Sequence, residues 1–167
     1  MTHQSISDKV KIKSKKKRSH SSRMWLQRQL NDPFVKQAQI DGYRSRAAYK
    51  LREMAKKFKL FDKADVIVDL GAAPGGWLQI AKSIKPKAFV VGVDLQDYED
   101  VTGTIKIVGD ITDETTLNIL AQTLEGRKAD VILSDMAAAS CGIASVDHDR
   151  IMGLLEMTFD FALDHLN

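Results

Sequence analysis

Three aspartates follow short apolar runs and could each do distinct chemistry. Asp94 suits hydrogen bonds from the two ribose hydroxyls of an adenosine ligand, and Asp110 could accept one from an exocyclic adenine amine. Asp135 could hold a neighbouring ammonium and neutralise a cationic ligand. Each also has a purely structural interpretation, since Asp110 could cap a helix or turn and an aspartate at a strand end is often structural.

A glycine-rich turn, Gly71-Ala72-Ala73-Pro74-Gly75-Gly76, precedes Trp77. Glycines allow a tight turn and close approach to a ligand, and Asp94 follows Gly71 by 23 residues, which together indicate a nucleoside cofactor. NAD and S-adenosylmethionine both satisfy that pair. The turn lacks the G-x-G-x-x-G order, and Pro74 has no N–H for a diphosphate, which favours S-adenosylmethionine over a nicotinamide cofactor.

The elements that must position these residues alternate between strands and helices. Short runs rich in Val and Ile predict strands at Val66–Leu70, Ala88–Asp94, Thr104–Val108 and Asp130–Ser134, separated by helices at about 76–84, 113–124 and 147–166. This spacing predicts an α/β fold with a doubly wound parallel sheet flanked by helices. Ligands of such sheets bind beyond the carboxyl ends of the strands, where the three aspartates fall.

Two helices are expected ahead of the first strand. Asp32-Pro33 predicts the start of a short helix over 33–40, and a second helix should bury Ala47, Leu51, Met54, Ala55 and Phe58. Lys50 lies at the margin of that buried stripe, while Arg46, Lys56 and Lys57 should face water. We expect a disordered basic arm over 1–22, N-terminal helices over 23–62, and a cofactor-binding α/β domain over 63–167.

The net charge of +3 hides a strong asymmetry. Residues 1–59 hold 17 Lys and Arg against four acidic residues, whereas residues 60–167 hold 8 against 18. A basic front half favours a nucleic acid partner, although a solubilising tail would also explain the run from Lys9 to Arg18. With one cysteine, Cys141, and no secretory or membrane-spanning segment, we expect a cytoplasmic monomer that needs neither membrane nor metal.

Together, the Arg44-Ser45-Arg46 segment with Lys50, the GAAPGGW turn, Asp94, Gly109-Asp110 and Ser134-Asp135-Met136-Ala137 resemble the FtsJ/RrmJ family of ribosomal RNA methyltransferases. The resemblance runs from about Trp25 to the last residue. It implies an S-adenosylmethionine-dependent, Rossmann-like fold and methylation of a uridine ribose 2′-hydroxyl in 23S rRNA of the large ribosomal subunit. The residues that it implies for cofactor binding are Gly71, Gly75, Trp77, Asp94, Asp110 and Asp135, and those for RNA binding are Lys15, Lys16, Lys17, Arg18, Arg44 and Arg46.

Lys50 and Asp135 match the first two members of the family's Lys-Asp-Lys-Glu catalytic tetrad. The family carries the second lysine and the glutamate on later strands, and no lysine follows Lys128 here. We therefore expect a C-terminally truncated chain that lacks the last strands and transfers no methyl group by itself. The alternative is a non-catalytic RNA-binding remnant of such an enzyme. A second departure, Ala137 to Ser140 where the family has Pro and Asn, affects local substrate contacts.

Overall fold

The computed structural model describes residues 31–137 and 141–167. The predicted basic arm, including Lys15, Lys16, Lys17 and Arg18, lies outside them. The described residues up to Arg46 belong to one compact unit, and Ala47–Asn167 form a second. The division falls inside the predicted 23–62 segment, because the helix that begins at Ala47 packs on the α/β body rather than with the preceding residues.

The first unit contains helix α2, Pro33–Ile40, which confirms the helix predicted over those residues. Asp32 caps it by accepting a hydrogen bond of 2.9 Å from the Phe34 N–H, and Pro33 occupies the first turn, where a missing N–H costs nothing. Asp32 also forms an ion pair with Arg46. The prediction that Arg46 only faces water was therefore incomplete: its side chain is 58% exposed yet held by an acid 14 residues earlier.

The second unit is built on a four-stranded sheet in the order β3-β2-β1-β4, with every pairing parallel. The strands are β1 Val66–Leu70, β2 Phe89–Asp94, β3 Ile105–Val108 and β4 Val131–Ser134. These bounds confirm the four predicted strands to within one residue. The carboxyl ends of all four meet at one edge of the sheet, which is where Asp94 and Asp135 lie.

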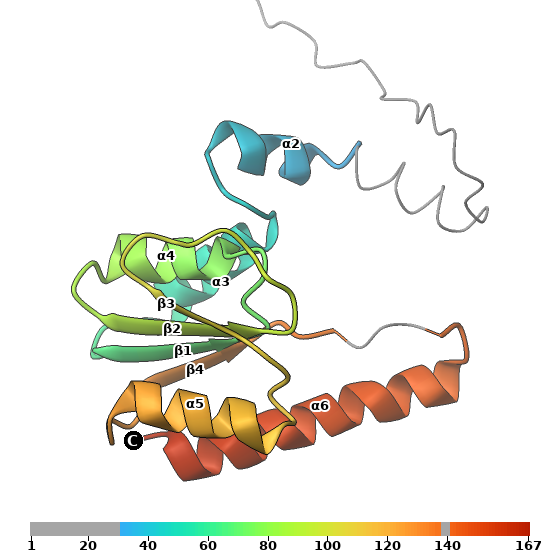
Figure 1. Cartoon of the computed structure of the whole chain (residues 1–167). Helices are drawn as coiled ribbons and strands as arrows, with labels where there is room; N and C mark the ends of the chain where they lie inside the picture. The colour runs from blue at the N-terminus through green and yellow to red at the C-terminus, as the bar shows by residue number, and fades with distance from the viewer. Residues whose placement is uncertain (1–30, 138–140) are drawn as a thin grey trace, which may run out of the picture. The chain divides into compact units, whose positions relative to one another are not determined.

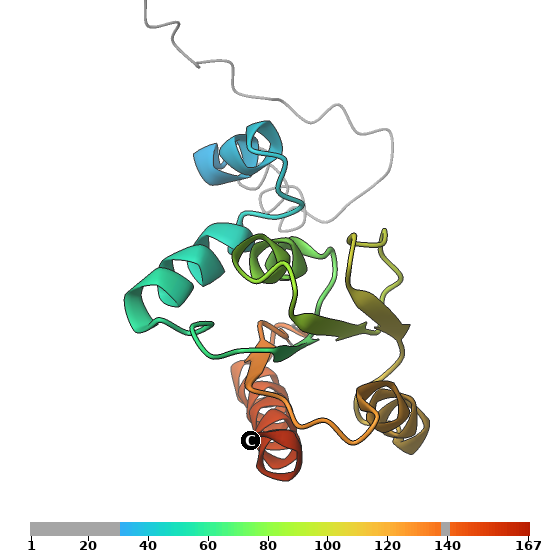
Figure 2. The same cartoon turned by 90° about the vertical axis from the view of Figure 1, so that its left-hand side faces the viewer.

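Helices cover both faces of the sheet (Figures 1 and 2). Helices α3 (Ala47–Phe58) and α4 (Gly76–Ile84) lie on one face, and α5 (Glu114–Leu124) and α6 (Ala144–His165) lie on the other. Helix α6 starts three residues before the predicted position. A sheet buried on both faces needs apolar residues on both, which explains why its strands read as continuous Val and Ile runs. The core on the α5 and α6 side comprises Val68, Leu70, Val91, Val93, Ile107, Ile111, Leu120, Leu124, Ala129 and Phe161.

Helix α3 buries Leu51 and Ala55 as predicted, and it also buries Ala48 completely. Ala47 and Met54, predicted in the same stripe, are only half-buried. The prediction that Phe58 belongs to the buried stripe was wrong, because this residue is 66% exposed. Phe58 is the last residue of α3, and its ring lies beyond the edge of the packed layer. The Lys57 ammonium lies 5.2 Å from the centroid of that ring. Position within a periodic stripe does not guarantee burial at a helix end.

Candidate functional site

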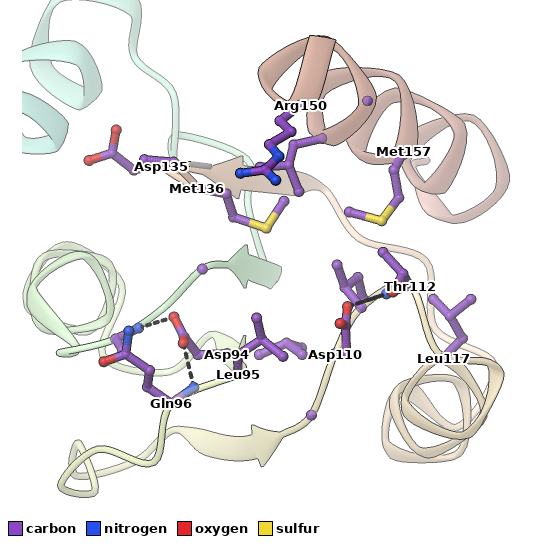
Figure 3. Close-up of a pocket in the computed structure, with 18 residues that line it drawn as sticks. Asp94, Leu95, Gln96, Asp110, Thr112, Leu117, Asp135, Met136, Arg150 and Met157 are labelled. Carbon is purple, nitrogen blue, oxygen red and sulfur yellow. Dashed lines mark hydrogen bonds between the residues drawn. The ribbon is translucent and has the colours of Figure 1, made fainter. Parts of the chain in front are cut away.

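A cavity of about 1080 Å³ opens beyond the carboxyl ends of the strands. Figure 3 shows its lining, which comes from the ends of β2, β3 and β4, the turn after β1, Leu117 of α5, and one face of α6. The described lining residues carry three carboxylates, Asp94, Asp110 and Asp135, and one cation, Arg150. The structure therefore brings the three predicted aspartates to a single cleft, at the edge of the sheet where the fold class places ligands.

Asp94 is held in place by backbone on both sides. Its Oδ2 accepts a hydrogen bond of 2.8 Å from the Ala73 N–H, and its Oδ1 accepts one of 2.7 Å from the Gln96 N–H. An ionised carboxylate offers about four acceptor sites, so each oxygen keeps one for a ligand. The strand end and the glycine-rich turn are thus tied together through the carboxylate that would receive ribose hydroxyls (Figure 3).

Asp110 uses one oxygen for its own turn. Its Oδ1 accepts from the backbone N–H of Thr112 at 2.9 Å and from the Thr112 hydroxyl at 2.7 Å. These bonds hold the pKa of the Asp110 carboxyl below its usual range, so the group is ionised over the physiological range. The turn interpretation and the ligand interpretation of this residue are therefore compatible, because the second oxygen remains for a donor in the cleft.

Lys50 and Asp135 meet at the same cleft. The Lys50 Nζ lies 2.6 Å from Oδ1 of Asp135, although the residues come from α3 and from the residue after β4. Their side chains are 57% and 39% exposed. An ion pair this open contributes little to stability, so its geometry matters for what the ammonium can reach rather than for folding. Asp135 lines the cavity, and the Lys50 ammonium therefore lies at its rim.

Two glycines of the turn adopt backbone conformations with positive φ. Gly71 has a φ of +83°, and a Cβ there would lie 2.5 Å from Cγ of Met136. Gly75 has a φ of +101°, precedes α4, and donates its N–H to the Ala72 carbonyl at 2.6 Å. Gly71 lines the cavity and Gly75 does not. Both positions require glycine for the turn, whether or not a ligand is bound.

Trp77 is placed differently from the other predicted cofactor residues. Its side chain is 6% exposed, does not line the cavity, and donates its indole N–H to the Ala47 carbonyl at 2.8 Å. The Lys50 ammonium lies 5.5 Å from the centroid of its ring. Its predicted contact with the cofactor stays a prediction, and it could be made only through its backbone in this arrangement.

The sequence analysis missed Asp69, the penultimate residue of β1. It is 1% exposed, and neither of its carboxylate oxygens has a hydrogen-bond partner. Burial, followed by repulsion from Asp135 and Asp94, raises the pKa of the Asp69 carboxyl to about 8. An acid within an otherwise apolar strand was the available signal for a buried carboxyl, because a strand covered on both faces has no solvated side.

The cavity also contains residues that sequence reasoning had not assigned. Arg150, Gly153, Leu154 and Met157 recur at helical spacing on α6 and line one wall, with Met136 at the end of β4 beside them (Figure 3). The sequence analysis predicted a helix over this segment but no face of it, because Arg150 and Gly153 interrupt any apolar stripe that would have marked the face. Within residues 31–137 and 141–167, no helix is long and apolar enough to cross a membrane, and no cluster of three His, Cys, Asp or Glu could hold a metal ion.

Fold and cleft together define a class: an α/β protein with a carboxylate-lined cleft at the carboxyl edge of a parallel sheet. Comparison with known proteins narrows it. The model of the FtsJ-like methyltransferase family matches residues 43–167. The ribosomal RNA large subunit methyltransferase E of Sphingopyxis alaskensis is 47% identical over 157 residues, which cover 94% of this chain and 68% of that protein. The protein of the same name from Acidiphilium cryptum is 47% identical, covering 99% of this chain and 75% of its own length.

A solved structure agrees with these sequences. A protein described as a ribosomal RNA methyltransferase from Plasmodium falciparum superimposes with a TM-score of 0.69 at 29% identity, covering 75% of this chain and 73% of that one. The chain belongs to the FtsJ-like methyltransferase family. Its cofactor is therefore S-adenosyl-L-methionine.

The cleft fits that cofactor. Its carboxylates can accept hydrogen bonds from hydroxyl and amine donors, and three of them give the site the negative charge that a sulfonium cation requires. Asp94 and Asp110 lie at the ends of neighbouring strands β2 and β3, so an adenosine group can reach both. Asp135 lies on the far side of β1, at the end of β4, beside Lys50.

Proposed function

We propose that this protein transfers a methyl group from S-adenosyl-L-methionine to the ribose 2′-hydroxyl of a uridine in 23S rRNA of the large ribosomal subunit, in the cytoplasm. The observation that carries this proposal is the Lys50–Asp135 ion pair at the rim of the cofactor cleft. It joins two members of the tetrad that the resemblance to ribosomal RNA 2′-O-methyltransferases implies. Identity of 47% to two ribosomal RNA large subunit methyltransferases E supports the substrate.

The chemistry requires a weak nucleophile to be oriented before it reacts. The cofactor supplies an electrophilic methyl group when it is bound. We assign Lys50 the orientation of the substrate, because an ammonium with three donors can hold a ribose oxygen while it also donates to Asp135. Asp135 fixes the ammonium and balances its charge next to a cationic cofactor. Asp94 and Asp110 would bind the ribose and adenine ends of the cofactor.

Arg44, Arg46 and the basic run at Lys15 to Arg18 are proposed to bind the RNA backbone. Clustered Lys and Arg gain affinity by displacing the counterions of phosphates. Arg46 is fixed by its ion pair with Asp32 and still exposes 58% of its side chain, which leaves its guanidinium accessible to a phosphate. The proton acceptor implied by the family is a second lysine, and no lysine follows Lys128 in this sequence.

The test is an assay of labelled methyl transfer to large ribosomal subunits that lack the modification. It compares this chain with a chimera that adds the residues of the Sphingopyxis alaskensis relative that follow its aligned region. The expected product is a 2′-O-methyluridine in 23S rRNA, mapped by resistance of the adjoining phosphodiester to alkali. Transfer to a base, or to a small-subunit RNA alone, would overturn the proposal.

The second candidate function, a non-catalytic RNA-binding protein, predicts a different result. Both proteins would then bind S-adenosyl-L-methionine and rRNA, and neither would transfer a methyl group. The specific observation behind this candidate is that the cleft and the Lys50–Asp135 ion pair can bind cofactor and RNA without a reaction. Activity in the chimera would support the methyltransferase proposal and rule out this second candidate.

A further inference from the structure

The Trp77 indole connects the two helices on one face of the sheet. It is the second residue of α4 and lies against α3, where its N–H donates to the Ala47 carbonyl at 2.8 Å. A buried indole needs a partner for its N–H, and a carbonyl in the first turn of a helix keeps a lone pair for one. The glycine-rich turn that lines the cofactor cleft therefore holds the start of α3 through this residue.

The same ring supports Lys50. Ala47 and Lys50 are three residues apart on α3 and so lie on the same side of the helix. The Lys50 ammonium is 5.5 Å from the centroid of the indole, within the range at which a cation is attracted to an aromatic face. Its other anchor is the Asp135 carboxylate at 2.6 Å.

Such support matters because lysine is flexible. A four-carbon side chain that is 57% exposed would otherwise sample many rotamers, and an ion pair in water restrains it only weakly. Two restraints from different directions, a carboxylate and an aromatic face, reduce those rotamers. Tryptophan gives the strongest attraction of this kind among the aromatic side chains.

We propose that the side chain of Trp77 is a positioning residue that holds the Lys50 ammonium toward Asp135, and that it does not bind the cofactor. The inference deepens the proposed function, which supplies the substrate that Lys50 would orient. The absence of Trp77 from the described lining of the cavity, together with its hydrogen bond to α3, separates this role from cofactor binding. The turn that lines the cofactor cleft would thereby also fix Lys50.

The test uses this chain, labelled with ¹³C-lysine, and needs no methyl transfer. The Lys50 ε-methylene is assigned by the loss of its signal in Lys50→Arg. Because the neighbouring Nζ lies 5.5 Å from the indole centroid, the proton signal of this methylene should be shifted upfield of lysines that face no ring. Lys57 and Lys106 also face rings, so only the assigned Lys50 signal is compared between variants. The shift should be lost in Trp77→Leu and reduced but present in Trp77→Phe, which keeps a ring without the N–H. The affinity for S-adenosyl-L-methionine, measured by calorimetry, should stay unchanged in Trp77→Phe.

The matched control is Tyr49→Leu, which removes the ring that lies 4.9 Å from the Arg52 guanidinium on the same helix. It should leave the Lys50 signal where it is. An ordinary Lys50 signal in the unmodified protein, or an upfield shift that survives in Trp77→Leu, would overturn the inference. Loss of cofactor affinity in Trp77→Phe would also overturn it. None of these readouts depends on turnover, so failure of the methyl-transfer assay is distinguishable from failure of this inference.

Discussion

The Lys50 ammonium and the Asp135 carboxylate lie 2.6 Å apart, although 85 positions separate them in the chain. One belongs to a helix on the face of the sheet, and the other follows its edge strand β4. They meet because α3 packs beside α4 on one face and β4 pairs directly with β1. The ammonium is thereby brought to a cleft whose other described charges are mostly negative.

Removing the ammonium should separate binding from reaction. In the chimera that carries the additional relative sequence, Lys50→Met should lower methyl transfer by about 100-fold, because misplacing a reacting group costs roughly that much. Its affinity for S-adenosyl-L-methionine should stay unchanged, whereas Asp135→Asn should weaken it, since Asp135 lines the cleft. Lys87→Met, in the exposed segment before β2, is the control and should change neither. Full activity in Lys50→Met would contradict the assignment.

Asp110 should determine recognition of the adenine amine. We expect Asp110→Ala to weaken binding of S-adenosylhomocysteine by about tenfold, as expected for a lost hydrogen bond to a charged group. Asp110→Ala should not weaken binding of S-inosylhomocysteine, the analogue of S-adenosylhomocysteine in which hypoxanthine replaces adenine and the exocyclic amine is absent. Asp113→Ala, three residues along in the same connection and exposed, is the matched control. Calorimetric titration measures all four combinations, and equal losses for both ligands in Asp110→Ala would show that the residue only supports its turn.

Asp69 should make stability fall as the pH rises. Burial raises its pKa to about 8, whereas an unfolded aspartate titrates near 3.8, so between these values the folded state holds a proton that the unfolded state has lost. The free energy of unfolding should therefore decrease from about pH 4 to pH 8 by this contribution and level off above it. Asp69→Asn should remove this pH-dependent decrease. The substitution should change the free energy of unfolding little near pH 4 and raise it by on the order of several kcal/mol near pH 8.

Urea unfolding at several pH values checks that difference. Other carboxylates, such as Asp130, whose pKa is lowered first by the Asp65 N–H and then by Asn167 and the Val66 N–H, contribute with the opposite sign. They contribute equally to both proteins, so only the difference between the two curves reports Asp69. Asp62→Asn, at an exposed carboxyl, should give a curve parallel to that of the unmodified protein. A parallel curve for Asp69→Asn would rule out a neutral buried acid.

The basic arm should account for part of the salt dependence of RNA binding. Changing Lys15, Lys16, Lys17 and Arg18 to Ser should reduce the slope of log affinity against log salt by roughly 3, the value for four phosphate contacts to single-stranded RNA. Filter binding of a 23S rRNA fragment between low and moderate salt measures the slope. Changing Lys82, Lys85, Lys87 and Lys128 to Ser removes the same charge elsewhere and should leave the slope largely intact. If both sets of substitutions reduce it equally, the arm acts only through its net charge.

The sequence by itself determined the strands and the class of cofactor. Alternating Val and Ile runs with intervening helical segments are local signals, so the four strands and the parallel sheet follow from them. The turn around Pro74 and the aspartate at the end of β2 are likewise local in the chain, and they indicated S-adenosyl-L-methionine before any contact was known. Phe58 was placed wrongly because periodicity does not reveal where the packed layer ends.

Tertiary structure decided which of these residues act together. Three features depend on contacts between distant segments: Lys50 touches Asp135, the Trp77 indole lies near that ammonium, and the Asp69 carboxyl is buried without a hydrogen-bond partner. A residue type and its spacing specify local geometry, but burial and the distance between two side chains depend on how helices pack on the sheet. The sequence therefore identified the cofactor site, and only packing showed how the lysine is held at its rim.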